Sequence, residues 1–264
     1  MEARPNAAEV VGRLLALRCV ATHALAAPPR DVIEEWLGRW TEVERERYAH
    51  ESDTQSRAFW STVNSSQIST YLSPWERQFA TTTMLTMSGQ DQIEALWRVE
   101  AAKVFMWALH LIPELHKPDT KADPDLLKSE ILSRPANLFS SASLRPETEI
   151  DHARDVAELW HWRSRTEELI REERPFPIDE EVFRKQGIRS YRDIVRMAAH
   201  AAHESGDLHL LIGGDFGVNG KAYAELSPEE WSEVRSISIE RHRALNWLCG
   251  YSRGNDWDAT PTDT

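Results

Sequence analysis

The apolar and polar positions follow a helical period along most of the chain. Apolar residues recur at spacings of three and four, as on one face of an amphipathic helix. Ser73-Pro-Trp-Glu76 and Ser227-Pro-Glu-Glu230 each place Ser at the N-cap, Pro at the first helical position and Glu two positions later, which predicts a capping box. The spacing predicts helices over 6–26, 30–48, 56–70, 74–87, 90–112, 123–133, 148–173, 179–186, 190–204 and 228–251.

One segment breaks this helical rule. The run from Leu208 to Gly213, a turn cluster, and the run from Lys221 to Leu226 predict a short β-hairpin near residues 208–226. No shift in composition divides the chain elsewhere. We therefore expect a mainly α protein that forms a single multi-helix globular domain over residues 1–264, in which the helices of 6–70 could be a peripheral layer.

Composition narrows the classes of partner and compartment. The chain has 264 residues with 31 Lys+Arg against 43 Asp+Glu, a net charge of −12, which disfavours nucleic acid and anionic membrane surfaces. The two cysteines, Cys19 and Cys249, exclude a disulfide scaffold and fit a reducing compartment. The longest clean apolar run, 104–109, is too short for a membrane span. We expect a cytoplasmic protein without a membrane or nucleic-acid partner.

Charged residues occur inside the apolar stripes of three predicted helices. Projection at 100° per residue places Glu100 at the centre of the stripe of 90–112 and Arg241 at the centre of that of 228–251. Charges also lie among the apolar residues of the helix at 148–173, namely His152, Arg163 and Glu167.

A buried charge costs several kcal/mol unless it is paired and hydrogen-bonded. We therefore expect Glu100 and Arg241 to face one another, with Arg163 and Glu167 nearby in the same network. Two interpretations stay open. The network is either an ion-pair cluster that fixes helix register, or the lining of a pocket for a polar or anionic ligand.

Two further pairs of polar residues have the spacing of an acid–base site or a metal site. His242 and Asn246 are four residues apart, so Asn246 could orient the imidazole for acid–base work, or His242 is a core-edge histidine. Asp256 and Asp258 alternate as ligands of a hard cation do, but the loop lacks the calcium-binding register. A solvated or helix-capping acidic tail is the favoured interpretation, and no metal is expected.

Other motifs fail on inspection. His200 and His203 fall on the wet face of a helix whose stripe would be Tyr191, Ile194, Ala198 and Ala201. The glycine-rich run 213–221 has an aspartate and an alanine where a phosphate loop needs other residues. Cys249 lies on an apolar stripe and should be inert. No catalytic residue and no cofactor are therefore predicted.

The chain contains 11 tryptophans. Trp97, Trp107 and Trp160 lie in apolar stripes beside the charged positions, and we expect their indole N–H groups to donate to buried carboxylates. Trp36 and Trp40, one turn apart on a charged helix, are expected to be exposed and to mark a partner surface.

Several motifs together resemble one known family. They are Glu240-Arg-His-Arg-Ala-Leu-Asn-Trp-Leu-Cys-Gly-Tyr251, Asp256-Trp-Asp258 with Thr262-Asp-Thr264, Trp97-Arg98-Val-Glu100 with Trp107-Ala-Leu109, Asp215 to Lys221, and more loosely Arg13 to Leu25. The chain from about residue 7 onward is similar to a bacterial family known as domain of unknown function 4272. The resemblance implies no activity, cofactor or substrate, although its motif positions include Glu100, Arg241 and His242.

The favoured function is a non-enzymatic binding or protein-interaction domain, because no nucleophile, metal set or phosphate loop was found. The partner would be an unknown protein or a small polar ligand. The expected binding residues are Arg98, Glu100, Arg163, Glu167, Arg241, His242, Asn246, Asp256 and Asp258. One alternative is an enzyme that acts on a small polar or anionic ligand through Glu100, Arg163, Arg241 and His242. Another is an acidic immunity or antitoxin-like protein that binds a basic partner.

Overall fold

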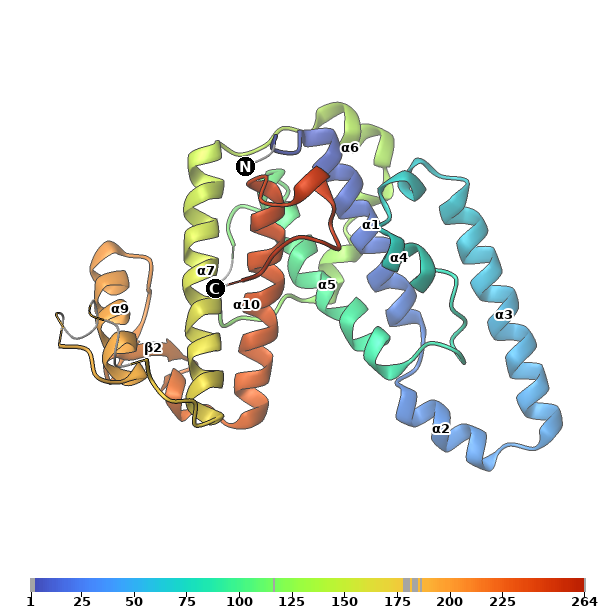
Figure 1. Cartoon of the computed structure of the whole chain (residues 1–264). Coiled ribbons are helices and arrows are strands. Elements are labelled where there is room, and N and C mark those ends of the chain that lie inside the picture. Colours follow the sequence, from blue (N-terminus) through green and yellow to red (C-terminus); the bar gives the residue numbers. More distant parts are fainter. Residues whose placement is uncertain (1–2, 116, 178–180, 182–184, 186, 264) are drawn as a thin grey trace. The chain divides into compact units, whose positions relative to one another are not determined.

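A computed structural model describes residues 3–115, 117–177, 181, 185 and 187–263. The predicted mainly α fold is confirmed (Figure 1). The contacts divide the chain into two compact units. Unit 1 comprises Met1–Leu115, Ala122–Ile150 and Asn246–Pro261, and unit 2 comprises His116–Lys121, Asp151–Leu245 and Thr262–Thr264. Each unit is described by itself, and the single domain over 1–264 stays a prediction.

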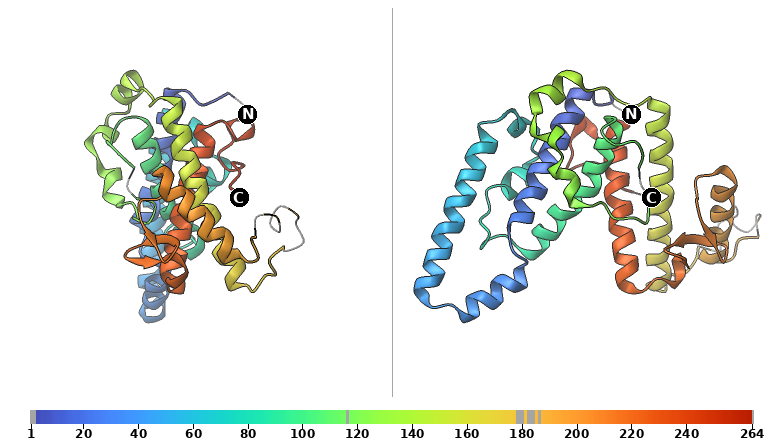
Figure 2. Two further views of the ribbon diagram at one scale, coloured as in Figure 1. Left: turned by 90° about the vertical axis from the view of Figure 1, so that its left-hand side faces the viewer. Right: turned by 180° about the vertical axis from the view of Figure 1, so that it is seen from behind.

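Unit 1 is built around two long helices that lie side by side, α1 (Ala7–Ala26) and α5 (Gly89–Ala108) (Figures 1 and 2). Asn6 and Glu9 form a capping box at the start of α1, and 13 of the 20 residues of the helix are buried. One window within Ala7–Arg39 is apolar enough to cross a membrane, but 72% of it is buried in the structure. Burial in the core accounts for that composition, so it is weak evidence for a span.

The prediction of one helix over 30–48 is wrong. The first helix, α2 (Arg30–Arg39), ends with Trp40 as its C-cap, and α3 (Glu42–Asn64) begins two residues after Trp40. Thr41 caps α3 through a capping box with Glu44, which the apolar spacing did not reveal. The expected separate helix at 56–70 is therefore the end of α3, followed by the 3₁₀-helix η1 (Gln67–Tyr71).

The remaining helices of unit 1 are shorter and more often interrupted than the helical period of apolar residues predicts. The capping box at Ser73 is confirmed, but α4 (Pro74–Phe79) is short, and the chain turns before α5. The expected helix at 123–133 is two 3₁₀ turns, η2 (Pro124–Lys128) and η3 (Glu130–Ser133). Proline starts a helix that the spacing did not predict, α6 (Pro135–Ser141). Near the C-terminus, η5 (Arg253–Asn255) also belongs to this unit.

The core of unit 1 joins α1 to α4, α5 and the end of α3. Its buried members include Val20, Phe79 and Met87, and Phe59 and Trp60 of α3 pack on it from outside. Gly12 is where α1 and η1 approach most closely, because a Cβ there would lie 2.3 Å from the Tyr71 ring. Only a residue without a side chain fits at this contact.

Unit 2 contains α7 (Glu147–Arg171), α9 (Tyr191–Ser205), a small sheet, the 3₁₀-helix η4 (Tyr223–Glu225) and α10 (Pro228–Leu248). The predicted capping box of Ser227 and Glu230 starts α10. The predicted helix at 179–186 lies outside the described residues, apart from 181 and 185.

A small sheet is present where the hairpin was predicted, but the predicted pairing of 208–213 with 221–226 is wrong, because the run expected as a turn contains the central strand. Strands β1 (Leu211–Ile212), β2 (Asp215–Val218) and β3 (Lys221–Ala222) form an antiparallel sheet in the order β1-β2-β3. Ile212 pairs with Asp215, so Gly213 and Gly214 make a two-residue turn with φ of 59° and 80°. Such a turn needs left-handed backbone at both positions, which glycine adopts without strain.

Packing on this sheet sets the rotation of α9. Its buried residues are Val195, Ala199 and Ala202, one position away from the predicted stripe of Tyr191, Ile194, Ala198 and Ala201. Ala199 and Ala202 join a core with Phe216 of β2 and Trp160 of α7. One position is about 100° of helix rotation, so Ile194 and Ala198 flank the buried face instead of forming it.

Candidate functional site

Arg163 of α7 is the centre of a buried polar cluster in unit 2. Its side chain is 1% exposed. The guanidinium binds Asp215 of β2 in a fork, with Nε–Oδ1 and Nη2–Oδ2 distances of 2.7 Å each. Asp215 also accepts the backbone N–H groups of Phe216 at 2.7 Å and Ala224 at 3.1 Å. All four acceptor positions of this carboxylate are thereby occupied.

Glu167, one turn further along α7, completes the cluster. Its two oxygens accept from Arg163 Nη2 and from Arg171 Nε, each at 3.0 Å. The Arg163 guanidinium lies 4.4 Å from the centre of the Tyr223 ring. Burial opposes the charged form of Arg163, but the bonds to Asp215 and the charge of Glu167 outweigh it and raise the pKa of the guanidinium. Arg163 therefore stays charged and fixed in place.

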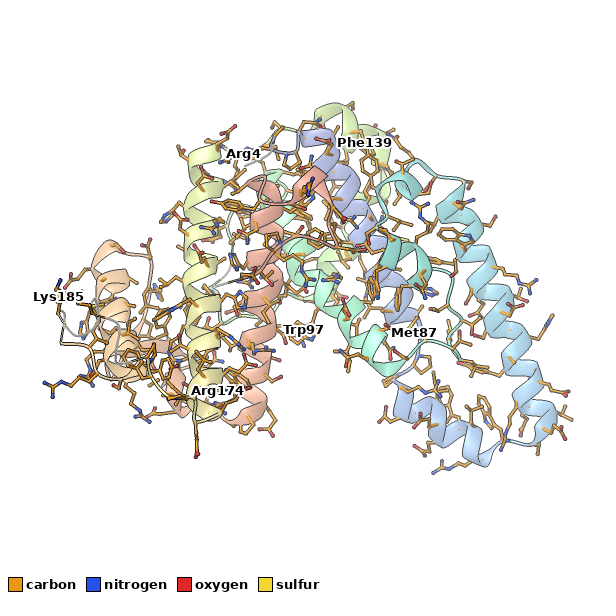
Figure 3. All side chains as sticks on the ribbon, in the orientation of Figure 1. Arg4, Met87, Trp97, Phe139, Arg174 and Lys185 are labelled. Carbon is orange, nitrogen blue, oxygen red and sulfur yellow. The ribbon has the colours of Figure 1, made fainter. Side chains whose placement is uncertain are left out.

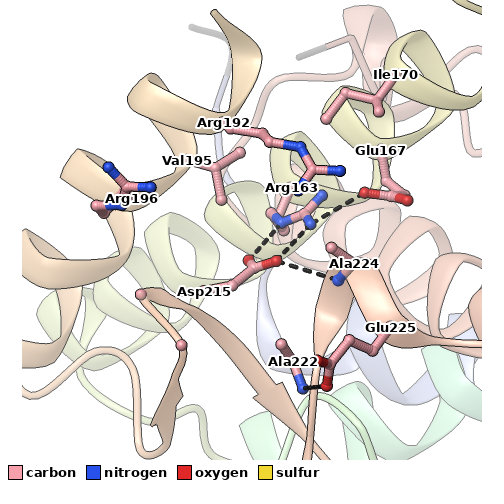
Figure 4. A pocket seen from close by; sticks show the side chains of 12 residues that line it. Arg163, Glu167, Ile170, Arg192, Val195, Arg196, Asp215, Ala222, Ala224 and Glu225 are labelled. Atoms are coloured by element: carbon pink, nitrogen blue, oxygen red, sulfur yellow. Dashed lines mark hydrogen bonds and ion pairs between the residues drawn. The ribbon is translucent and has the colours of Figure 1, made fainter.

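A cavity of about 220 Å³ opens above this cluster (Figure 4). Arg163 and Glu167 line it from α7, Arg192 and Arg196 from α9, and the Gly213–Gly214 turn from the sheet. In Figure 4 the guanidinium of Arg192 points toward Arg163. The turn positions Arg196, because a Cβ on Gly214 would lie only 3.2 Å from Arg196 Cγ.

Arginines and carboxylates both line this cavity. Asp215 and Glu167 are already bound to Arg163 and Arg171. The side chains of Arg192 and Arg196, by contrast, form no ion pair with any other residue that the structure describes. Glu225 also lines the cavity, where it accepts the backbone N–H of Ala222 at 3.2 Å. Within the same described part of the chain, Arg163 Nη1 is buried and lacks an acceptor. The cavity thus offers several guanidinium donors beside one carboxylate, Glu225, that is not held by an arginine.

Glu100 and Arg98 of α5 are buried, as expected for charges on an apolar stripe, with 1% and 3% exposure. Glu100 Oε1 accepts the backbone N–H of Ala122. Arg98 Nη2 binds Glu94 at 2.7 Å, and its guanidinium lies 5.4 Å from the centre of the Trp75 ring. Both residues belong to unit 1 and neither lines the cavity of unit 2.

Arg241 belongs to unit 2, where it donates to the backbone oxygens of Lys117 at 2.9 Å and Thr120 at 2.6 Å. Its expected partner Glu100 belongs to unit 1. Because each unit is described by itself, the pairing of Glu100 with Arg241 stays a prediction. Arg163 and Glu167 do form an ion pair, with Nη2 and Oε2 3.0 Å apart. Arg163 also binds a second carboxylate, Asp215, which the helical spacing did not predict.

His242 is fully buried and faces a second histidine. The Nδ1 atoms of His161 and His242 lie 3.0 Å apart, so one ring donates and the other accepts. Burial is the main cause that lowers the pKa of His161 to about 4 and that of His242 to about 3. Nearby arginines add to it at His161, and the charge of His161 followed by that of Arg154 adds to it at His242. Both rings are neutral near pH 7. Asn246, in turn, donates its Nδ2 to the backbone oxygen of Pro261 at 2.9 Å.

The two C-terminal aspartates cap backbone groups of unit 1. Asp256 Oδ1 accepts the N–H of Asp258 at 3.0 Å, and Asp258 Oδ2 accepts the N–H of Trp75 at 3.1 Å. Among the residues that the structure describes, no three His, Cys, Asp or Glu side chains are grouped to hold a metal ion. His200 and His203 are exposed on α9.

Two expectations about the stripes are wrong. His152 is exposed, with Nε2 3.5 Å from Asp207. Trp160 Nε1 is buried without a hydrogen-bond partner among the described residues, so this indole does not donate to a carboxylate.

The other tryptophans depart less from expectation. Trp107 is buried, with the Arg145 guanidinium 5.0 Å from its ring centre, whereas Trp97 (labelled in Figure 3) is only partly buried. Trp36 and Trp40 are partly covered instead of fully exposed, because their rings stack with centres 5.7 Å apart.

Some polar residues were missed entirely. Arg13 of α1 and Glu76 of α4 form a buried ion pair in unit 1, with 4% and 0% exposure. In unit 2, Asp215, Arg192 and Arg196 were also missed. The available signals were an arginine in the otherwise apolar stripe of 6–26 and two arginines at i and i+4 on one face of 190–204.

Comparison with known proteins returned one family. The model of Domain of unknown function (DUF4272) matches residues 2–186 of the chain. No curated protein and no solved structure matches. The matched part contains Arg163 and Glu167, whereas Asp215, Arg192 and Arg196 lie beyond it, as does the C-terminal motif from Glu240.

Proposed function

Because the chain belongs to the family called Domain of unknown function (DUF4272), whose description assigns no activity, we propose a function from the chain's own residues: unit 2 binds a small multivalent anion. The ligand class is a phosphate-like oxyanion. Its site is the cavity between α7, α9 and the Gly213–Gly214 turn.

One observation carries this proposal. Arg192 and Arg196 line the same cavity and form no ion pair among the described residues, and two of its three carboxylates, Asp215 and Glu167, are already bound by Arg163 and Arg171. Glu225 is the third carboxylate, so the two arginines exceed it by one charge. Guanidinium groups bind oxyanions through two parallel hydrogen bonds, and Arg163 Nη1 offers a further donor. That atom is shielded from solvent, so an oxygen reaches it when one of the exposed side chains of Arg192 or Arg196 moves aside.

The two alternatives from the sequence have less support. An enzyme site was expected to combine Glu100, Arg163, Arg241 and His242, but only Arg163 lines this cavity. An immunity-like role with a basic partner rests on the net charge of −12 alone. Binding without chemistry agrees best with a cavity whose ionisable groups are arginines and carboxylates, of which Asp215 and Glu167 are held in ion pairs.

Inorganic phosphate is the first probe, measured by calorimetry and by thermal unfolding of the full chain. A ligand present at 100 times its Kd adds about 2.7 kcal/mol of stability, so a clear rise in Tm is expected. Arg192→Gln and Arg196→Gln should each weaken binding about tenfold, because each removes a charge-assisted hydrogen bond worth about 1.5 kcal/mol.

Arg189→Gln is the matched control. Arg189 is exposed three residues before Arg192, and it does not line the cavity. It should leave phosphate binding unchanged. The proposal is wrong if phosphate neither binds nor raises Tm, or if Arg189→Gln weakens binding as much as Arg192→Gln does.

A further inference from the structure

Resting on the proposed function, we infer that the anion bound by unit 2 carries an apolar tail, and that the tail occupies a second cavity beside the first. The ligand class is then an amphiphile with a phosphate-like head. The second cavity has a volume of about 460 Å³ and is lined mainly by apolar side chains.

The two cavities share the same pair of helices. Leu159 and Trp162 of α7 and Ile194 and Ala198 of α9 line the second cavity. Arg163 lines the first and follows Leu159 by one helical turn, about 6 Å along the axis. On α9 the two sets of lining residues lie on different sides of the buried face, Arg192 and Arg196 at the first cavity and Ile194 and Ala198 at the second, so the link between the cavities is the face of α7. A ligand with its head at Arg163 therefore finds the apolar cavity within one turn of α7.

The rotation of α9 creates this apolar surface. Because Ala199 and Ala202 pack on the sheet, Ile194 and Ala198 stay only partly buried and face the gap beside α7. Leu159, at the floor, packs against the core that contains Trp160 and Phe216. The cavity is thus an open edge of the core, and an apolar chain placed there would gain hydrophobic burial.

The charges set the direction of the ligand. Asp155 and Glu158 border the apolar cavity, and both bind Arg154, at 3.2 and 2.6 Å. No residue that lines this cavity is a cation. Arg154 largely neutralises these two carboxylates, so the apolar cavity offers an anionic head no attraction, whereas Arg192 and Arg196 attract it. The head therefore lies in the first cavity and the tail in the second.

The test is a chain-length series on the full chain. Inorganic phosphate and methyl, butyl, hexyl and octyl phosphate are titrated below their micelle concentrations. Each methylene buried should tighten binding about fourfold until the cavity is filled. The matching 1-alkanols, which lack the charged head, should bind far more weakly.

The outcomes separate this inference from the proposed function. If phosphate binds and the Kd stays flat along the series, the tail is wrong and the anion site stands. If neither phosphate nor any alkyl phosphate binds, the proposed function itself fails. An alkanol that binds as tightly as its alkyl phosphate overturns the assignment of the head to the arginines.

Two variants of α9 sharpen the result. Ile194→Asn places an amide in the tail cavity and should abolish most of the gain with chain length, while the Kd for inorganic phosphate is unchanged. Met197→Asn is the control, because Met197 is 47% exposed on the same helix and lines neither cavity. Circular dichroism verifies that both variants fold. Equal loss of the chain-length gain in both variants would contradict the inference.

Discussion

Two buried arginines, Arg13 in unit 1 and Arg163 in unit 2, are built alike. Each binds a buried carboxylate, and each lies over an aromatic ring, with distances to the ring centre of 5.3 Å at Trp257 and 4.4 Å at Tyr223. Each also lines a cavity of similar volume, about 250 Å³ for Arg13 and about 220 Å³ for Arg163.

The difference lies in the charges around each cavity. Glu9 and Asp256 line the cavity of Arg13, whereas Arg192 and Arg196 line the cavity of Arg163. The carboxylates at the cavity of Arg13 repel an anion, and the arginines at the cavity of Arg163 attract it. A buried arginine beside a cavity is therefore not enough to identify an anion site. The surrounding charges decide whether its role is structural or binding.

The largest expected effect is on the free energy of unfolding, and it tests whether Arg13 and Arg163 stabilise the fold equally. Arg13→Ala leaves Glu76 buried without its cation, and Arg163→Ala does the same to Asp215. Each change should lower the free energy of unfolding by about 3–5 kcal/mol, because an uncompensated charge remains in the interior. Urea denaturation measures it.

Arg39→Ala is the control for this pair, because Arg39 and Glu35 form an exposed ion pair on α2. Its effect should be below about 1 kcal/mol. A loss of less than about 1 kcal/mol in Arg13→Ala or Arg163→Ala would end the structural equivalence of the two sites.

Acid should destabilise the protein through the histidines of unit 2. The folded pKa values of His161 and His242 are about 4 and about 3, below the usual value near 6.5 of an unfolded chain. Between pH 6.5 and about 4 the unfolded chain binds more protons, so stability falls as the pH falls through that window. The expected loss is on the order of 3 kcal/mol for each ring between pH 7 and pH 4.

Denaturation at several pH values, with His161→Phe beside the native chain, isolates this contribution. The variant should depend less steeply on pH in that window, because one of the two titrating rings is gone. His200→Phe, at an exposed position of α9, should keep the native slope. Identical slopes in all three proteins would exclude the buried pair as the cause.

Substitution of two glycines should have the smallest effects on stability, and it separates the cavity of Arg13 from the cavity of Arg163. Gly12→Ala pushes a Cβ into the Tyr71 ring and should cost about 1–3 kcal/mol of stability. Gly214→Ala meets a positive φ of 80° and Arg196 Cγ, so it should lower stability by about 1–2 kcal/mol and also weaken phosphate binding. Only the second change reaches the anion site.

Gly38→Ala is the reference for both, since nothing lies within 4 Å of a Cβ there. It should stabilise the chain by about 0.5–1 kcal/mol, as alanine does in an exposed helix. Thermal unfolding and phosphate titration of the three variants give both readouts. Weakened phosphate binding in Gly12→Ala would contradict the separation of the two cavities.

The local chemistry of the chain was enough to predict several elements and buried charges. Ser73 and Ser227 begin helices as their capping boxes predict, because the cap and its partner are only three residues apart. The burial of Glu100, Arg163 and Glu167 also followed from helical spacing. A helical face is a local property, so its charged members can be read without knowing what packs against it.

The breaks between helices were less predictable. Thr41 caps α3 where the apolar period runs on from Trp40, so a strong cap overruled the spacing. The expected α-helix at 123–133 forms 3₁₀ turns instead. Such short elements depend on tertiary packing more than on their own period.

By itself, then, the sequence determined a mainly α chain with charges on its buried faces, because periodicity and capping act within a few residues. Tertiary structure decided what those charges do. Asp215 binds Arg163 although the two residues are 52 positions apart in the sequence. Arg192 lines the cavity on α9, whose buried face packs on the sheet and lies one position away from the predicted stripe. The face that a helix buries and the partner that a charged side chain finds both depend on the elements packed against that helix. The spacing of residues along the sequence therefore cannot predict either one.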